Sequence, residues 1–185
     1  MSSELDYEIN KELGECYLFM GELDRAEDYY QKALGSNGVH PDPFLGLATI
    51  AVQRGQLDQA MVLYQKAARI EENDKALAGM GLVHMETGAH QEAFEHLKRS
   101  LEKNPENLVA LYGLIQVAHT LEKLDEAVTF MNGYLAITPQ SEEVRFALAG
   151  CLFKLGRSDE ARPHLEQILA GNPEHESARE LLAQL

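Results

Sequence analysis

The sequence predicts an all-α protein built from five helical hairpins in one array. A marker residue recurs with steps of 34, 33, 34 and 34 residues, at Gly21, Gly55, Gly88, Glu122 and Gly156. A fixed period of this length is typical of arrays of helical hairpins. Five residues after each marker the chain always has an alanine, namely Ala26, Ala60, Ala93, Ala127 and Ala161. A column that holds only a methyl group indicates the place where two helices approach most closely.

Turn and breaker residues place the elements in order. The first hairpin has a helix to about residue 20 and a second helix from 24 to about 34, and the second hairpin has helices at 43–54 and 58–70. The later hairpins close at Asn104-Pro105, Thr138-Pro139 and Asn172-Pro173, where proline follows a helix that it cannot continue. We therefore expect one domain over residues 1–185, with repeats at about 7–40, 41–73, 74–107, 108–141 and 142–175 and a capping helix at 176–185.

The two cysteines occupy a column of the first helices that otherwise holds apolar side chains. Cys16 and Cys151 align with Ile50, Val83 and Val117. We expect both thiols to be buried, since a free cysteine in such a column behaves as a small hydrophobic residue. Four repeats separate them, so the sequence also predicts that they are too far apart for a disulfide.

The repeated residues identify a family by resemblance. The stretch from Gly55 to Ala67 has a near copy from Gly21 to Ala33. The later repeats keep the alanine and a closing proline in register, and two of the three keep the glycine and a leucine in the column of Tyr30 and Tyr64. This pattern resembles the tetratricopeptide repeat (TPR). The resemblance implies a right-handed superhelical solenoid of antiparallel helix pairs, with the first helices lining a concave groove. It also implies a non-catalytic scaffold or adaptor for protein–protein interaction.

Composition narrows the class of partner. The chain of 185 residues is 45% hydrophobic and 25% charged, and its 16 basic and 30 acidic residues give a net charge of -14. Such a chain repels phosphate backbones and anionic lipids, so we expect neither nucleic acid nor membrane as a partner. The N-terminus lacks the basic start and apolar run of a secretory signal, which predicts a cytoplasmic protein.

No pattern of catalytic or metal-binding residues stands out. The seven histidines include no pair at the i, i+4 spacing of a helical metal site, and no cysteine is near them in the sequence. No phosphate loop or nucleophile motif is present. We therefore expect no enzymatic activity, no metal and no cofactor.

The resemblance also implies which residues face a ligand. Apolar side chains recur at groove-facing positions of the first helices, and contiguous exposed apolar surface is typical of an interaction site. The predicted partner-binding residues are Glu15, Leu45, Leu82, Met85, Tyr112, Gln116, Phe146 and Phe153. The expected partner is another protein, as a peptide or amphipathic helix with a basic end over the acidic first repeat. The alternative is that these side chains belong to the core between neighbouring repeats.

Three further features depart from a regular helical pattern, and each predicts a local effect on the structure. Gly46, Gly79 and Gly113 share one column, and glycine inside a helix indicates close approach of either a ligand or the next helix. Glu122 replaces the turn glycine of the fourth repeat, at a cost of about 1 kcal/mol if that position has positive φ. Pro163 falls inside an expected helix and removes one of its hydrogen bonds.

Two other functions remain open from the sequence. One is a structural role in which the array associates with itself. The other is RNA binding, because a different family of helical hairpins has nearly the same period. The acidic composition and the uncharged centre of the predicted groove favour a protein partner over RNA.

Overall fold

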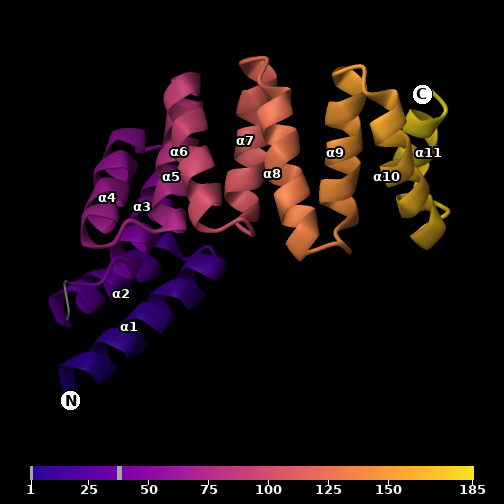
Figure 1. The fold of residues 1–185 in the computed structure, drawn as a ribbon. Helices are drawn as coiled ribbons and strands as arrows, with labels where there is room; N and C mark the ends of the chain where they lie inside the picture. The colour runs from indigo at the N-terminus through magenta and orange to yellow at the C-terminus, as the bar shows by residue number, and fades with distance from the viewer. Residues whose placement is uncertain (1, 37–38) are drawn as a thin grey trace. The chain divides into compact units, whose positions relative to one another are not determined.

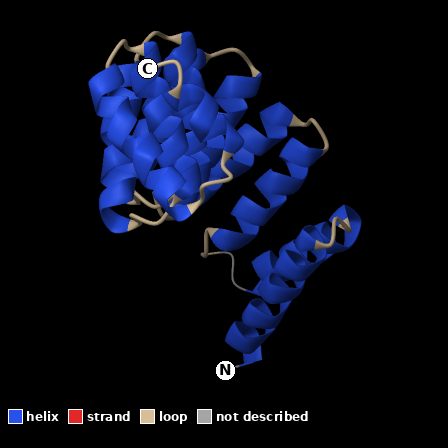
Figure 2. Ribbon diagram, turned by 90° about the vertical axis from the view of Figure 1, so that its right-hand side faces the viewer, coloured by secondary structure: helices blue, strands red, loops and turns tan. Residues whose placement is uncertain are grey.

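The computed structural model describes residues 2–36 and 39–185, with the side chains of residues 2 and 3 left aside. Over these residues the chain forms eleven helices joined by short loops, and the described part contains no strand (Figure 2). The all-α prediction is therefore confirmed. The helices are α1 (Ser2–Phe19), α2 (Leu23–Ser36), α3 (Asp42–Gln53), α4 (Leu57–Ile70), α5 (Asp74–Glu86), α6 (His90–Lys103), α7 (Leu108–Thr120), α8 (Leu124–Ile137), α9 (Glu142–Lys154), α10 (Ser158–Gly171) and α11 (Glu176–Leu182).

The helices fall into two compact units. Unit 1 is Met1–Lys103 and includes α1 to α6, whereas unit 2 is Asn104–Leu185 and includes α7 to α11 (Figure 1). Within unit 1, successive helices α1 to α6 pair as three hairpins, and within unit 2, α7 pairs with α8 and α9 with α10, while α11 packs on α10. The two units are described separately, and one continuous array over residues 1–185 stays a prediction.

The alanine column is fully buried in every hairpin. All five alanines, Ala26, Ala60, Ala93, Ala127 and Ala161, have no exposed surface. Each lies in the first turns of the second helix of its hairpin. A larger side chain there would separate the two helices, because protein cores are packed without spare space.

Helices α5, α7, α9 and α11 begin at the same position of the repeat, where a side chain caps the helix. The capping side chain accepts a hydrogen bond from the backbone N–H three residues later, with N–H donor to acceptor distances between 2.8 and 3.4 Å. The capping residues are Asn73, Asn107, Ser141 and His175. Asparagine and serine are favoured at such positions because they satisfy an N–H group that has no partner inside the helix.

The marker residues end the first helices with a left-handed turn. Gly21, Gly55, Gly88 and Gly156 have φ between 72° and 77°, and Glu122 adopts the same conformation with φ of 58°. The N–H of the next residue bonds back to the carbonyl five positions earlier, as Lys123 does to Ala118 at 2.8 Å. This is the glycine-terminated helix end, in which a side chain with a Cβ is strained. The expected strain at Glu122 therefore has its geometric cause in the structure.

Replacing Glu122 by glycine is expected to stabilise unit 2 by about 1 kcal/mol, because glycine adopts positive φ without steric cost. The measurement is the free energy of unfolding from denaturant titration. Glu122→Ala is the matched control, since it removes the same charge but keeps the Cβ. Equal stabilisation by the two substitutions would show that charge, and not backbone strain, governs this site.

The prediction that both cysteines are buried is wrong for Cys16. Both thiols are free, and Cys151 is buried as expected, but Cys16 is exposed. The column is buried where a preceding hairpin covers it, as Ala26 and Tyr30 of α2 pack with Ile50 of α3. Within the described residues no hairpin precedes α1, so nothing covers Cys16.

The native protein is expected to react with a small thiol reagent at Cys16 alone. Burial raises the pKa of the Cys151 thiol, which further lowers its reactivity, although the nearby Lys154 opposes this shift. A colorimetric thiol assay should count one reactive group per native chain and two after denaturation. In Cys16→Ser the native count should fall to zero, and a reactive thiol remaining in that variant would contradict the assignment.

Candidate functional site

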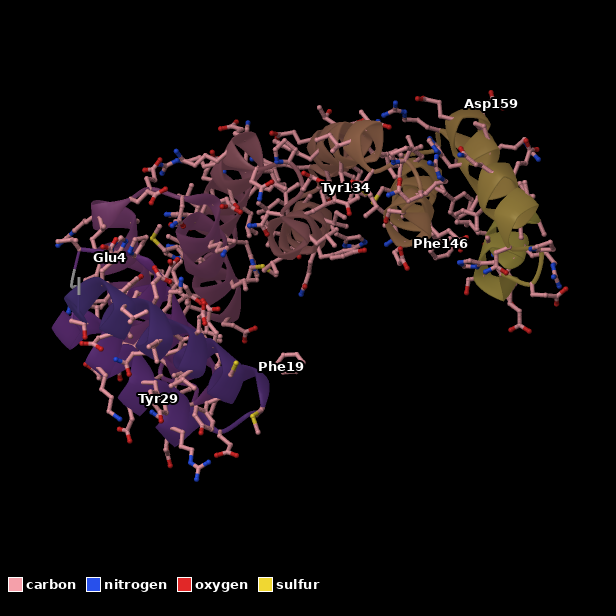
Figure 3. The ribbon with its side chains drawn as sticks, turned by 90° about the horizontal axis from the view of Figure 1, so that it is seen from below. Glu4, Phe19, Tyr29, Tyr134, Phe146 and Asp159 are labelled. Carbon is pink, nitrogen blue, oxygen red and sulfur yellow. The ribbon has the colours of Figure 1, made fainter. Side chains whose placement is uncertain are left out.

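Unit 2 presents aromatic side chains from two first helices. Tyr112 on α7 is 43% exposed, and Gln116 lies one turn further on the same face and is also exposed. Phe146, labelled in Figure 3, and Phe153 are half-buried on α9. They are two turns apart and therefore lie on one face of the helix. These four predicted residues come together as one partly exposed surface of unit 2, which we call the unit 2 face.

Side-chain contacts show that the helices of the unit 2 face adjoin. His119 on α7 and Lys154 on α9 touch through Nε2 and Nζ. Partial burial and the negative charge of Glu143 on α9 raise the pKa of the Tyr112 phenol. The Phe146 ring lies 5.3 Å from that of His175, the residue that caps α11. The face therefore extends over α7, α9 and the start of α11.

Gly150 leaves open space between the two phenylalanines of α9. A Cβ built on Gly150 would meet no heavy atom within 4 Å outside its own helix. Glycine inside a helix costs about 1 kcal/mol relative to alanine, and here no neighbouring side chain requires it. Gly150 is not among the partner-binding residues predicted from the sequence, although a glycine at a groove-facing position was the available signal.

Unit 1 places its predicted residues differently. Leu82 and Met85 are half-buried on α5, and Glu15 is exposed on α1. Leu45 is only 9% exposed and belongs to a core cluster with Tyr64 and others. The interpretation of Leu45 as a ligand contact is therefore corrected: α4 and α5 contribute the side chains that surround it, and it is part of the core.

An acidic group on unit 1 surrounds two buried phenols. Burial, and then the charge of Asp42, raises the pKa of Tyr7 to about 12, with Glu8 and Glu15 adding to the rise and Lys11 opposing it. Burial, Glu15 and Asp42 likewise raise the pKa of Tyr30. The carboxylates of α1 and α3 therefore lie close enough to act on the same hydroxyl groups, and this part of unit 1 is strongly negative.

The column of glycines inside the first helices is explained by the preceding hairpin. A Cβ on Gly46 would lie 2.2 Å from Cζ of Tyr30, and one on Gly79 would lie 2.2 Å from Cε1 of Tyr64. Tyr30 and Tyr64 are buried residues of the second helices α2 and α4. At these two positions the close approach comes from a neighbouring helix and not from a ligand.

The described residues contain neither a candidate metal site nor a candidate membrane-spanning helix. Among residues 2–36 and 39–185, no group of three or more histidine, cysteine, aspartate or glutamate side chains could hold a metal ion. In those ranges no helix combines the length and apolar character needed to cross a bilayer.

The fold and the repeated contacts define a class of proteins made of stacked helical hairpins. The chain matches the family model described as tetratricopeptide repeat over residues 20–81, 84–145 and 122–185. The chain therefore belongs to the tetratricopeptide repeat family, which confirms the resemblance. Proteins of this family are generally scaffolds for protein interaction and are typically non-catalytic.

Relatives and similar structures extend the comparison. The chain is 34% identical over 128 residues to the BBSome complex member BBS4 of Bos taurus, covering 69% of this chain and 24% of that protein. It is 27% identical over 163 residues to the TPR repeat-containing protein MJ1428 of Methanocaldococcus jannaschii, covering 86% and 28%. The chain thus spans less than a third of the length of these relatives.

Two solved structures share the fold. PilF of Pseudomonas aeruginosa has a TM-score of 0.80 at 20% identity, covering 100% of this chain and 90% of that one. YrrB, a TPR protein described as having an unusual peptide-binding site, has a TM-score of 0.66 at 20% identity, covering 90% and 87%.

Proposed function

We propose that this protein is a non-catalytic adaptor that binds a peptide or helix of another protein on the faces of its first helices. The unit 2 face takes apolar side chains of the partner, with Tyr112, Phe146 and Phe153 as the main contacts and Gln116 as a polar one. On unit 1, considered by itself, Leu82 and Met85 offer a further apolar contact, and Glu15 favours a basic segment of a partner.

The open space at Gly150 is the observation that carries this proposal. Some helical glycines accommodate a close neighbour, as Gly46 and Gly79 do, whereas others, such as Gly133, do not. Gly150 has no such neighbour, lies between two half-buried phenylalanines and still lacks a side chain. A partner side chain that enters this space gains contact with both rings, and aromatic residues commonly dominate binding energy in such sites. The TPR fold of YrrB supports the proposal by showing that such an array can carry a peptide-binding site.

The proposal predicts opposite effects of one substitution on stability and on binding. Gly150→Leu fills open space and raises helix propensity, so the free energy of unfolding should stay the same or rise by up to about 1 kcal/mol. The same leucine should block the partner. The measurement is the binding of peptides selected from a random displayed library on the native protein, with dissociation constants determined by fluorescence anisotropy.

Further variants separate a binding role from a packing role. Tyr112→Ala should weaken a selected peptide by about 2 kcal/mol, roughly 30-fold in Kd, because partly exposed aromatic anchors contribute most at such contacts. Gly133→Leu, at an exposed and open position of α8, is the control and should leave binding unchanged. If Gly150→Leu and Tyr112→Ala bind every selected peptide as the native protein does, the unit 2 face is not the binding site.

A further inference from the structure

The outer face of α1 carries an apolar stripe that none of the described residues covers. Leu5 is 62% exposed, Ile9 47% and Met20 64%, and Cys16 is exposed as well. Spacings of four, seven and four residues place these side chains along one side of the helix and its end. We call these four residues the α1 stripe. Phe19, 95% exposed at the same end, stands clear of the ribbon in Figure 3.

Two residues of the α1 stripe, Ile9 and Cys16, correspond to positions that are buried in the later hairpins. The opposite side of α1 packs on α2, where Tyr7 and Gly14 are buried. Ile9 aligns with residues that are buried in the following four first helices, namely Pro43, Ala76, Ala110 and Val144. Cys16 aligns with Ile50, which packs on α2 of the hairpin before it. Ile9 and Cys16 therefore occupy helix-packing positions, whereas Leu5 and Met20, whose equivalents Val39 and Arg54 are exposed, extend the apolar surface at its two ends.

The charge beside the stripe indicates which helix fits it. Glu4, Glu8, Glu12 and Glu15 are exposed and follow one another along α1 at spacings of four, four and three, so they form a row on one side of the stripe. The only basic residue of α1, Lys11, pairs with Glu8 at 2.6 Å. A second copy of this chain would bring two such rows together in a protein that already has a net charge of -14. Like charges at a contact are unfavourable, whereas a basic row opposite them is favourable.

We propose that α1 is a second docking surface, which binds an amphipathic helix of another protein. The apolar side of that helix packs along the α1 stripe, and its lysine or arginine row faces the glutamate row. This surface is on unit 1 and uses none of the residues of the unit 2 face, although its glutamate row includes Glu15, which the proposed function also uses. Gly150→Leu and Tyr112→Ala test the unit 2 face alone, and Ile9→Gln tests the α1 stripe alone.

Two synthetic helical peptides test this proposal on the full chain. They share one seam of leucine and alanine, and they differ in carrying either lysines or glutamates beside that seam. The lysine peptide should bind at least about tenfold more tightly than the glutamate peptide in fluorescence anisotropy, with a difference that shrinks as salt is added. Because Cys16 lies in the stripe, saturating lysine peptide should also slow its alkylation by an uncharged maleimide, about tenfold or more.

Variants locate the bound peptide. Ile9→Gln should weaken the lysine peptide about tenfold without changing stability, because Ile9 is exposed in the free chain. Val62→Gln, at an equally exposed apolar residue of α4, is the matched control and should have no effect. Equal binding of both peptides, or loss of binding in Gly150→Leu, would overturn the proposal. A dimer of the native chain that Ile9→Gln dissociates in analytical ultracentrifugation would also overturn it, since the occupant would then be a second copy.

Discussion

Gly46→Ala is expected to destabilise unit 1 by about 2 kcal/mol, although alanine is the better helix former. Higher helix propensity contributes about 1 kcal/mol in favour of alanine. The new methyl group would lie 2.2 Å from the Tyr30 ring, far inside van der Waals contact. The ring cannot move away easily, because a Cβ on Gly14 would already lie 2.9 Å from its other atoms, so Gly14 and Gly46 both face it. Overpacking of this kind costs roughly 1–3 kcal/mol and more when no relaxation is available.

A double-mutant cycle isolates the contact. Tyr30→Met replaces the ring by a side chain that already occurs in this column, since Met131 precedes Ala147 in unit 2. In the Tyr30→Met background, Gly46→Ala should cost much less than in the native chain, and the coupling energy from denaturant unfolding should be about 1 kcal/mol or more. Gly133→Ala, where no atom lies within 4 Å, should instead stabilise the protein. Destabilisation of equal size in both backgrounds would rule out the ring as the cause.

Pro163→Ala is expected to stabilise α10 by about 2–3 kcal/mol. Pro163 lies inside α10, which runs from Ser158 to Gly171, and its side chain is exposed. Proline has no N–H to donate to the carbonyl of Asp159 four residues earlier, and its ring crowds that carbonyl. Alanine restores the hydrogen bond and removes the crowding, at no loss of buried surface.

Hydrogen exchange is the appropriate measurement, because repeat proteins open locally as well as globally. Amides of α10 and α11 should exchange more slowly in Pro163→Ala, while those of unit 1 stay unchanged. Arg162→Ala, at the exposed neighbouring residue, is the control and should leave exchange nearly as it was. Unchanged exchange of α10 in Pro163→Ala would show that the helix tolerates the proline without cost.

The repeat contacts could be predicted from the sequence because they depend on local geometry that recurs. Ala26 and its equivalents are buried without exception, since every hairpin brings its two helices together at the same point. Glu122 could be assigned to a position of positive φ for the same reason, because the four aligned residues are glycines. The turn at Glu122 is formed by the local backbone, whereas Ala26 also packs with Ile50 of the next hairpin.

Contacts between hairpins were less predictable. Cys16 is exposed because no hairpin precedes α1 among the described residues. The prediction that it is buried was wrong because comparison along a column assumes that every hairpin has a predecessor. Leu45 is buried because side chains of α4 and α5 enclose it, and the sequence does not show how far a neighbour reaches over a first helix. The open space at Gly150 could not be distinguished from the filled space at Gly46, since both residues are glycine and only the neighbouring atoms differ.

The pairing of Tyr30 with Gly46, and of Tyr64 with Gly79, bears on how such a chain can diversify by duplication and recombination. A hairpin with tyrosine at this position of its second helix fits before a hairpin whose first helix has glycine at the facing position. Hairpins with leucine or methionine there, as at Leu165 and Met131, are free of this requirement. The residues at the junctions therefore partly determine the order in which the hairpins can follow one another. A shuffled chain that places a hairpin with this tyrosine before the hairpin that contains Ala147 should assemble poorly.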